Sequence, residues 1–341
     1  MAFIRSIKTT FCVMALGLAF GAQAQSKLPI RLLVGFAPGG STDTVARVLA
    51  DKLHGVLGQT VIVENRPGAG GRMATEVLKN SAPDGLTYMV APNATSIFPS
   101  LLYPPSVLKY DLLKDLAPVA VVVSYPLALA VSSRTGATNV KEYVDWVKSH
   151  PKEGVFGTAG LGGQTHFTGL QFAKAAGLQL NVVPYRGNGP LATDLLGGQL
   201  PAAVMTAGDI AQHQGGGQVR VIGVFGDKRS PVMPDVPTVM EQGVKVATGD
   251  AWAGVWAPGK TPKAEIERMQ AALKQVLALP EVRSILMSKA ALNPDFRSAA
   301  ELDQLQRKEL AYWGPVIKAS GFTPSSDASR ACFPTYISRT P

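Results

Sequence analysis

The feature that most constrains this chain is an alternation of apolar, strand-like runs with segments of helical periodicity. Residues 30–36 form a run typical of a buried strand, and apolar residues spaced at helical intervals follow from Val45 to Leu57. Gly58 is a typical end for that helix. Because the same order recurs along the chain, we expect an α/β protein with parallel sheets covered by helices on both faces.

The remaining predicted elements follow the same alternation. Ser41 is the predicted N-cap of the first helix, because its hydroxyl can accept a hydrogen bond from a first-turn N–H. The further strands are expected at 61–64, 87–91, 119–123, 127–131, 154–158, 182–185, 202–205, 219–224 and 251–257. The further helices are expected at 72–80, 140–149, 165–176, 190–196, 262–279, 281–290 and 298–320.

The alternation starts again in the middle of the chain, which predicts two similar lobes. A length of 341 residues agrees with two domains. The chain is expected to pass to the second lobe near 124–127 and to return near 226–248. We therefore assign 25–125 to lobe 1, 126–247 to lobe 2 and 248–323 to the returning part of lobe 1. Two crossings predict a hinge and a cleft between the lobes.

The first 24 residues have the pattern of a secretory signal peptide. Arg5 and Lys8 form a basic start, an apolar run follows at 10–20, and residues 22–24 are a small-x-small cleavage site. The run is too short to span the roughly 30 Å of a bilayer core. We expect cleavage after Ala24 and a periplasmic protein.

Composition and charge exclude several classes of protein. A hydrophobic content of 46% excludes a disordered chain. Without Arg5 and Lys8, 31 Lys and Arg face 24 Asp and Glu, a scattered excess that suits small anions and gives no support to nucleic-acid binding. Cleavage would leave only Cys332, which excludes an intramolecular disulfide. No histidine pair has metal-ligand spacing, so we expect neither metal nor cofactor.

Two glycine-rich loops each lie between a predicted strand and a predicted helix. They cover residues 36–43 in the first lobe and 157–166 in the second. Glycine lets a ligand approach the backbone, and a helix start offers unpaired N–H groups with positive partial charge. This suits a carboxylate or a phosphate, although neither loop has nucleotide-binding spacing. Facing loops would hold a dianion by its two ends; the alternative is two unrelated connecting loops.

A few side chains are further candidates. Arg66 and Arg72 border a third glycine loop, where they reach an acid or simply pin the loop. Arg186 is a candidate cation of the cleft. His166 is either a general base or, as we favour, a first-turn residue that hydrogen-bonds a ligand or the backbone. Trp252 and Trp256 are expected in the core or the cleft wall, and the chain has no G-x-S-x-G motif.

The run PIRLLVGFAPGGSTD at 29–43 resembles the opening of the substrate-binding receptors of tripartite tricarboxylate transporters, the Bug family. Further matches follow in family order and extend to about residue 320. They are VENRPGAGG at 63–71, APDG at 82–85, VPYRG at 183–187, DLLGG at 194–198, PDVPT at 234–238, Trp252 and Pro258.

The resemblance implies a type II periplasmic-binding-protein fold, with two Rossmann-like lobes and a ligand cleft at the hinge. It implies an extracytoplasmic solute-binding protein that captures a small carboxylate-bearing ligand, an organic acid or an amino acid. The ligand would be held by backbone amides and ordered waters and delivered to the membrane subunits of a tripartite transporter. Such a protein is expected to be a monomer and not an enzyme.

The family pattern also places the ligand contacts on this sequence. In lobe 1 they are Phe36, Ala37, Pro38, Gly39, Gly40, Ser41, Asp43, Asn93, Ala94 and Thr95. In lobe 2 they are Thr158, Ala159, Gly160, Gly163, Gln164, Thr165, His166, Tyr185, Arg186, Thr206 and Asp209.

The chain departs from the family pattern at several places, among them the glycines at 215–217. Gly163-Gln164 stands where the family usually has a serine, which removes one hydroxyl contact. Asp209 lies in another divergent stretch, where it would favour a ligand amine or face solvent. The tail at 324–341 has no counterpart in the pattern, and disorder is one interpretation of it.

Two alternative functions share these features. One is a receptor of the same fold that reports ligand binding to a membrane sensor kinase. The other is an exported enzyme that uses His166.

Overall fold

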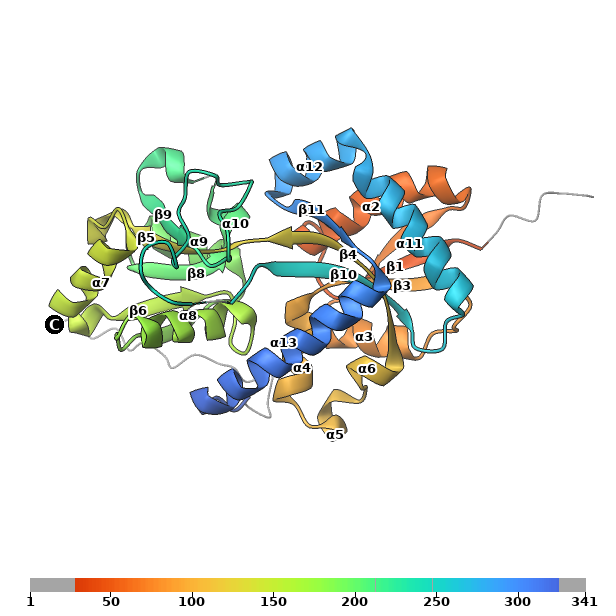
Figure 1. Ribbon diagram of the computed structural model, residues 1–341, viewed down its shortest axis with the longest axis horizontal. Coiled ribbons are helices and arrows are strands. Elements are labelled where there is room, and N and C mark those ends of the chain that lie inside the picture. Colours follow the sequence, from red (N-terminus) through yellow and green to blue (C-terminus); the bar gives the residue numbers. More distant parts are fainter. Residues whose placement is uncertain (1–27, 212, 247, 325–341) are drawn as a thin grey trace, which may run out of the picture.

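The computed structural model describes residues 28–211, 213–246 and 248–324 (Figure 1). The predicted signal peptide and, apart from residue 324, the predicted tail with Cys332 lie outside these residues. Within them the strands form a six-stranded sheet in the order β11-β4-β10-β3-β1-β2 and a five-stranded sheet in the order β7-β6-β8-β5-β9. Each sheet with its helices is one lobe.

The strands lie close to their predicted positions. The first sheet contains β1 (Ile30–Val34), β2 (Val61–Asn65), β3 (Thr87–Pro92), β4 (Leu116–Tyr125), β10 (Ala251–Pro258) and β11 (Asn293–Arg297). The second sheet contains β5 (Leu127–Ser132), β6 (Val155–Thr158), β7 (Asn181–Pro184), β8 (Ala202–Thr206) and β9 (Val219–Val224).

The helices cover the faces and the ends of the two sheets. In lobe 1 they are α2 (Ser41–Leu57), α3 (Arg72–Lys79), α4 (Asn93–Leu102), α5 (Pro105–Leu108), α6 (Leu112–Asp115), α11 (Lys263–Ala278), α12 (Pro280–Ala290) and α13 (Ala299–Ser320). In lobe 2 they are α7 (Val140–Ser149), α8 (Gln164–Ala175), α9 (Asn188–Leu196) and α10 (Ala207–Ala211). Short 3-10 turns are η2 (Ala69–Gly71), η3 (Ser133–Thr135), η4 (Pro151–Glu153) and η5 (Gln214–Gly216).

Both sheets are mixed, so the prediction of purely parallel sheets is wrong. Strands β1, β2 and β3 are parallel, as are β6, β7 and β8, but β10 is antiparallel to β3 and β4, and β5 is antiparallel to β8 and β9. Strand β11 is also antiparallel to its neighbour β4. Of the reversed strands, β5 and β10 arrive from the other lobe, whereas β11 follows α12 within lobe 1. A parallel neighbour needs a crossover connection within its own lobe, whereas a strand that enters from the opposite sheet has no such constraint.

The chain changes sheets twice, which agrees with the two predicted crossings. Tyr125 is the last residue of β4 in the first sheet, and Leu127 is the first of β5 in the second. The chain returns between β9 and β10, and β10 pairs with β4 along its length (Figure 1). The lobe boundaries at 125/126 and 247/248 stay a prediction.

Each sheet has apolar residues on both faces. In β1, Leu32 and Val34 pack on one side of the sheet and Leu33 on the other, all almost fully buried. In β5, Leu129 and Ala130 are separated in the same way. Side chains of a strand alternate between faces, so a continuous apolar run is what a sheet covered on both faces requires.

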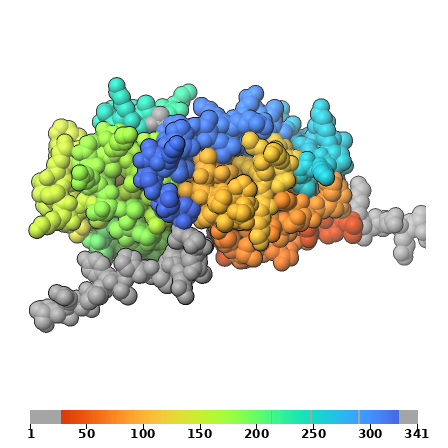
Figure 2. All heavy atoms as spheres, turned by 90° about the horizontal axis from the view of Figure 1, so that it is seen from below, coloured from red at the N-terminus to blue at the C-terminus, as the bar shows by residue number. Residues whose placement is uncertain are grey.

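A cluster of aromatic side chains joins the lobes along one side. Phe167 of α8 packs against Phe98 of α4, with ring centroids 5.9 Å apart, and Phe98 packs against Trp313 of α13 at 5.2 Å. Gln171 of α8 also donates a hydrogen bond to the hydroxyl of Tyr312 at 3.2 Å. Figure 2 shows the C-terminal helical segment in blue against both the green second-lobe atoms and the orange first-lobe atoms.

Three local predictions were wrong or incomplete. Gly40, not Ser41, is the N-cap of α2, and no side chain caps this helix. Helix α4 and strand β11 were not predicted, because Asn93–Leu102 contains Pro99 and the strand Asn293–Arg297 carries polar residues.

Among the described residues, no helix is both long and apolar enough to cross a membrane.

Candidate ligand-binding site

A cavity with a volume of about 950 Å³ is lined by residues of both lobes. Its walls come from segments that follow strands β1, β2, β3, β6, β7 and β8, together with the crossing strands β4, β5 and β10. Ligands of open α/β sheets bind outside the carboxyl ends of the strands, where helices begin. The cavity therefore lies where the fold predicts a ligand.

Helix N-termini surround this cavity. The lining includes Gly40, Pro92, Gly163 and Gly187, which are the N-cap residues of α2, α4, α8 and α9. None of these residues makes a side-chain capping bond. First-turn N–H groups lack partners within a helix, and the helix dipole adds positive partial charge there. Two lobes thus direct hydrogen-bond donors toward one space, which is an arrangement that binds anions.

The first glycine loop is fixed by a buried carboxylate. Asp43 accepts hydrogen bonds from the backbone N–H of Gly39 at 2.9 Å, from Arg47 at 2.8 Å and from Asn65 at 2.8 Å. Burial raises the pKa of Asp43, but these three hydrogen bonds outweigh it and hold the pKa below its ordinary value. Gly39 has a φ of 92°, a conformation that favours glycine. Asp43 therefore shapes the loop.

The second glycine loop is held by its own side chains. Thr158 and Thr165 share a hydrogen bond of 2.7 Å between their hydroxyls. His166 is 2% exposed, and its Nδ1 accepts a hydrogen bond from the backbone of Gly162 at 3.2 Å. Burial lowers the pKa of His166 to about 4, so the ring is neutral near pH 7. Phe167 and Phe322 pack on the ring, which makes His166 a structural residue of the loop.

A hydrogen-bonded chain of buried polar groups crosses from one lobe to the other beside the cavity. Asn93, at the start of α4, donates to Gln164 of α8 at 2.8 Å and to Glu309 of α13 at 3.2 Å. Glu309 also accepts from the indole N–H of Trp252 in β10 at 2.5 Å. Burial raises the pKa of Glu309 to about 7, although these two hydrogen bonds oppose the change. Gln164 continues the chain to the carbonyl of Thr248 at 3.3 Å.

The end of the cavity beside α10 is acidic. Asp209 of α10 accepts a hydrogen bond from the side-chain amide of Asn188, and that amide also donates to Thr206 at 3.4 Å. Burial raises the pKa of Asp209, and the hydrogen bond from Asn188 lowers it by less. Tyr125 lines the same cavity, and its pKa is raised by burial first and then by the charges of Asp209 and Glu309. These contacts place negative charge at the point where β4 passes into β5.

The structure brings most of the predicted ligand residues to this cavity. Those that line it are Phe36, Gly39, Gly40, Ser41, Asn93, Ala94, Thr95, Ala159, Gly160, Gly163, Gln164, Thr165, Thr206 and Asp209. Those that lie outside the lining are Ala37, Pro38, Asp43, Thr158, His166, Tyr185 and Arg186. Tyr185 donates its hydroxyl to Asp194 at 2.8 Å, and Arg186 is exposed. Ligand contact itself stays a prediction for every one of these residues.

The other candidates from the sequence lie in three different surroundings. Arg72 lines the cavity, with its guanidinium 4.0 Å from the ring centroid of Tyr103. Arg66 is directed instead at Glu64, with which it forms an ion pair. Trp252 and Trp256 lie in the core.

Tyr125, Asn188 and Glu309 were not predicted for the site, and each has a different reason. Tyr125 ends an apolar strand, and the predicted contacts near Asn188 stopped at Arg186. Glu309 lies in an amphipathic helix, where a single glutamate usually faces solvent. The lobe crossings are the signal that could have pointed to this region. Tyr125 ends the strand that passes to lobe 2, Asn188 lines the cavity between the lobes, and Glu309 belongs to the hydrogen-bonded chain that connects them.

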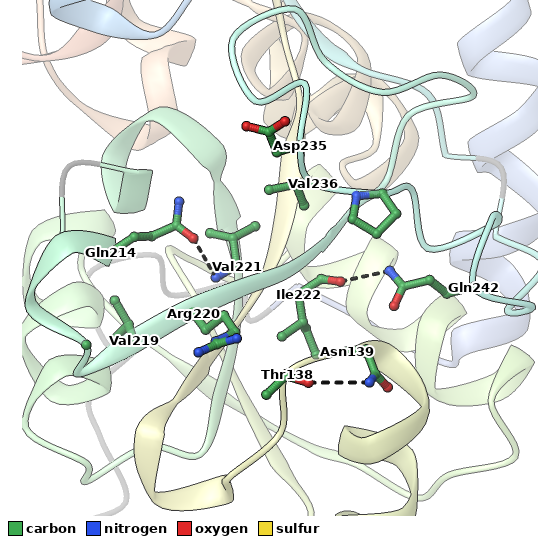
Figure 3. Close-up of a pocket in the computed structure, with 12 residues that line it drawn as sticks. Thr138, Asn139, Gln214, Val219, Arg220, Val221, Ile222, Asp235, Val236 and Gln242 are labelled. Atoms are coloured by element: carbon green, nitrogen blue, oxygen red, sulfur yellow. Dashed lines mark hydrogen bonds between the residues drawn. The ribbon is translucent and has the colours of Figure 1, made fainter.

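A smaller hollow of about 350 Å³ lies on lobe 2 and contains none of the predicted ligand residues (Figure 3). It runs along β9, the last strand of its sheet. Gln214 accepts a hydrogen bond from the N–H of Val221 at 3.1 Å, and Gln242 donates to the carbonyl of Ile222 at 2.8 Å. Glutamine side chains therefore bond backbone groups at the outer edge of this strand, and these bonds protect the edge from pairing with another chain.

Two α/β lobes joined by crossing strands, with a cavity between them bordered by helix N-termini, define a two-lobed solute-binding protein. The chain belongs to the tripartite tricarboxylate transporter receptors, since the profile of the tripartite tricarboxylate transporter family receptor matches residues 45–322. This confirms the resemblance that the sequence motifs indicate.

Relatives and solved structures agree with this assignment. Protein BugT of Bordetella pertussis is 32% identical over 297 residues, which cover 86% of this chain and 89% of the relative. The periplasmic binding protein BugD has 31% identity and a TM-score of 0.73, with 86% of this chain and 97% of that chain covered. MatC of Rhodopseudomonas palustris with bound malate has 30% identity and a TM-score of 0.73, with 85% and 99% covered.

These similarities settle two sequence predictions. The fold is the two-lobed periplasmic-binding-protein fold that the sequence predicts. The family and its structural neighbours are solute-binding receptors, so the chain is a receptor and not an enzyme. The alternative of an enzyme that uses His166 is dropped, and a buried imidazole of low pKa outside the cavity lining agrees with that.

Proposed function

We propose that this receptor binds a small carboxylate-bearing ligand between its lobes, outside the cytoplasm, and delivers it to the membrane subunits of a tripartite tricarboxylate-type transporter. The observation that carries the proposal is the meeting of uncapped helix N-termini from both lobes at one cavity. Two similar structures support it, MatC with bound malate and R. palustris Rpa4515 with adipate, the latter at 26% identity and a TM-score of 0.78 over 87% of this chain and 99% of that one.

In this proposal the backbone recognises the carboxylate. The N–H groups at the starts of α2 and α8 donate to its oxygens, and the helix dipoles stabilise its charge. Gly40 and Gly163 have no side chains, so the ligand can approach the backbone closely. Asp43 and the Thr158–Thr165 pair keep the two loops in shape before the ligand arrives. A preorganised set of donors binds more tightly because less freedom is lost on binding.

The proposed location depends on the signal peptide at residues 1–24, which lies outside the described residues. Cells that export the protein are expected to contain a mature form that begins at Gln25. Intact-mass measurement of the protein from a periplasmic extract checks this, and a mass that includes residues 1–24 would contradict it. Loss of uptake of the bound acid in cells that lack this receptor, and its recovery on re-expression, tests the delivery step.

A thermal-shift screen of organic acids tests ligand binding. A ligand that binds only the folded state stabilises it by RT ln(1 + [L]/Kd), about 2.7 kcal/mol at a concentration of 100 Kd. We expect at least one mono-, di- or tricarboxylate or amino acid to raise the melting temperature. Its methyl ester is the matched control, because it keeps the carbon skeleton and loses the charge. A complete panel without any shift, or equal shifts by acids and esters, would contradict carboxylate binding.

A further inference from the structure

The charges that line the cavity are opposite in sign and come from opposite lobes. Among the described lining residues, Arg72 in lobe 1 is the one cation and Asp209 in lobe 2 is the one anion. The helix N-termini of both lobes add donors for an anion. A cavity built for a simple dianion has no reason to contain a carboxylate, since it would repel the ligand. Asp209 therefore needs another explanation.

Asp209 has a polar partner but no counterion. Its carboxylate accepts a hydrogen bond from Asn188, and no ion pair joins it to a cationic side chain in the part of the chain that the structure describes. A partly buried carboxylate without a counterion is unfavourable, and an approaching cation relieves that cost. The pKa of Asp209 is raised by burial, which agrees with the lack of a nearby positive charge.

A buried acceptor without a partner lies on the side chain that bonds Asp209. The Oδ1 atom of Asn188 is buried and has no hydrogen-bond partner among the described residues. Tyr125, which also lines the cavity, feels the negative charges of both Asp209 and Glu309. The amide hydrogens of Asn188 are already directed at Asp209 and Thr206. A group that brings its own positive charge and its own N–H donors fits this end of the cavity.

We infer that the ligand of this receptor carries an ammonium group as well as a carboxylate, and that Asp209 receives the ammonium group. The inference rests on the proposed carboxylate-binding function and narrows it to amino acids and other amino-substituted acids. The carboxylate is held by helix N-termini, and the ammonium group lies at the end formed by Asp209, Asn188 and Tyr125. Asp209 then selects for the amine, because an acid without one leaves this carboxylate unpaired.

Isothermal titration of the mature protein with matched acids tests this. The series are L-aspartate, malate and succinate; L-glutamate, 2-hydroxyglutarate and glutarate; and 4-aminobutyrate, 4-hydroxybutyrate and butyrate. Within at least one series we expect the amino acid to bind about 10- to 100-fold more tightly than both its partners, the range for a charge-assisted hydrogen bond. Asp209→Asn should remove most of that preference and leave the affinity for the unsubstituted acid within about threefold.

Asp235→Asn is the matched control, since it removes the same charge from an exposed position of lobe 2 outside the cavity. We expect it to bind like the parent. If Asp209→Asn does not fold, as judged by its thermal melting curve, Asp209→Ser replaces it.

A hydroxy acid or an unsubstituted acid that binds as tightly as the amino acid in every series overturns the inference and leaves carboxylate binding intact. An equal loss of both ligands in the Asp209 variant also overturns it, whereas no binding by any acid overturns the proposed function too.

Discussion

Gly40 and Gly163 occupy the same position in two helices that belong to different lobes. Each is an N-cap and lines the cavity, and their φ values of −79° and −100° are open to any residue. A Cβ at Gly40 would meet only the carbonyl of Ala37 at 4.0 Å, and one at Gly163 would meet nothing within 4 Å. Glycine is thus not required by the backbone at either position, and the proposed reason for it is space for a ligand.

We therefore expect Gly40→Val and Gly163→Val to fold and to lose ligand binding. The valine side chains would occupy the space in which the carboxylate approaches the helix N-termini, so the affinity should fall by at least about 100-fold, more than a single lost hydrogen bond explains. Calorimetry with the best ligand of the acid screen measures the loss. Gly55→Val, at an exposed position with the same open surroundings, is the control. Parent-like binding by both cavity variants would contradict recognition by these backbone amides.

Asp43 illustrates a different kind of site residue. The sequence places it among the ligand contacts, but in the structure its carboxylate is bonded to Gly39, Arg47 and Asn65 and lies outside the cavity lining. The glycine loop and its helix could be predicted from the order of strand, glycines and helix, and most of the residues that the family resemblance assigned to the ligand line the cavity. The direction of the Asp43 side chain could not, because it depends on Asn65, which lies 22 residues away in the chain.

Asp43→Asn is expected to lower the free energy of unfolding at pH 7 by about 1.5–3 kcal/mol, the usual range for a hydrogen bond to a charged group. The folded-state pKa of Asp43 is below its ordinary value of 3.8, so its contribution to stability is present above about pH 3.8 and is lost as the pH falls through the folded pKa. The variant and the parent should therefore converge in strong acid. Urea unfolding at pH 7 and pH 3 measures this, with Asp51→Asn on the exposed face of α2 as control. A constant difference at both pH values would rule out the carboxylate as its source.

At the scale of elements, helix α13 is connected to lobe 2 through a carboxylate and one intervening amide. Glu309 bonds Trp252 of β10 and Asn93 of α4, and Asn93 continues to Gln164 of α8. The helix itself follows from its periodicity and from the capping box formed by Ser298 and Glu301. Its role between the lobes does not, since sequence periodicity indicates which face of a helix is buried and gives no information on which lobe covers that face.

Glu309→Gln is expected to change how stability depends on pH. Burial raises the folded-state pKa of Glu309 from 4.5 to about 7, so the contribution of this group is fully present below about pH 4.5 and is lost as the pH rises through about 7. At about 1.36 kcal/mol per pKa unit, the parent should lose about 3 kcal/mol relative to the variant between pH 4 and pH 8. Denaturant unfolding across this range measures the difference. Glu267 is exposed, and Glu267→Gln is the control, whose free energy of unfolding should depend on pH as that of the parent does. The same pH dependence in Glu309→Gln and the parent would contradict the raised pKa.

At the scale of the whole molecule, the order of elements predicts two α/β lobes and two crossings, but not the direction of every strand. Helical and strand periodicities are local and do not indicate direction. Strands β5 and β10 are antiparallel to their neighbours after entering from the opposite lobe, and β11 is antiparallel to β4 within its own lobe. The same crossings produce the cavity. Tyr125–Leu127 is a short connection between sheets, whereas the return from β9 to β10 is long. The aromatic contacts of α8 with α4 and α13 join the lobes on one side.

This arrangement predicts that a bound ligand brings the lobes closer together. A ligand that bonds the N-termini of α2 and α8 at once interacts better with a closed cleft than with an open one, and it therefore shifts the population toward the closed state. We expect small-angle scattering to give a smaller radius of gyration at saturation with the best ligand of the acid screen. Gly163→Val is the control, because the same ligand concentration should leave its radius unchanged. An unchanged radius for the saturated parent would mean that the cleft is closed before the ligand binds or that one lobe holds the ligand alone.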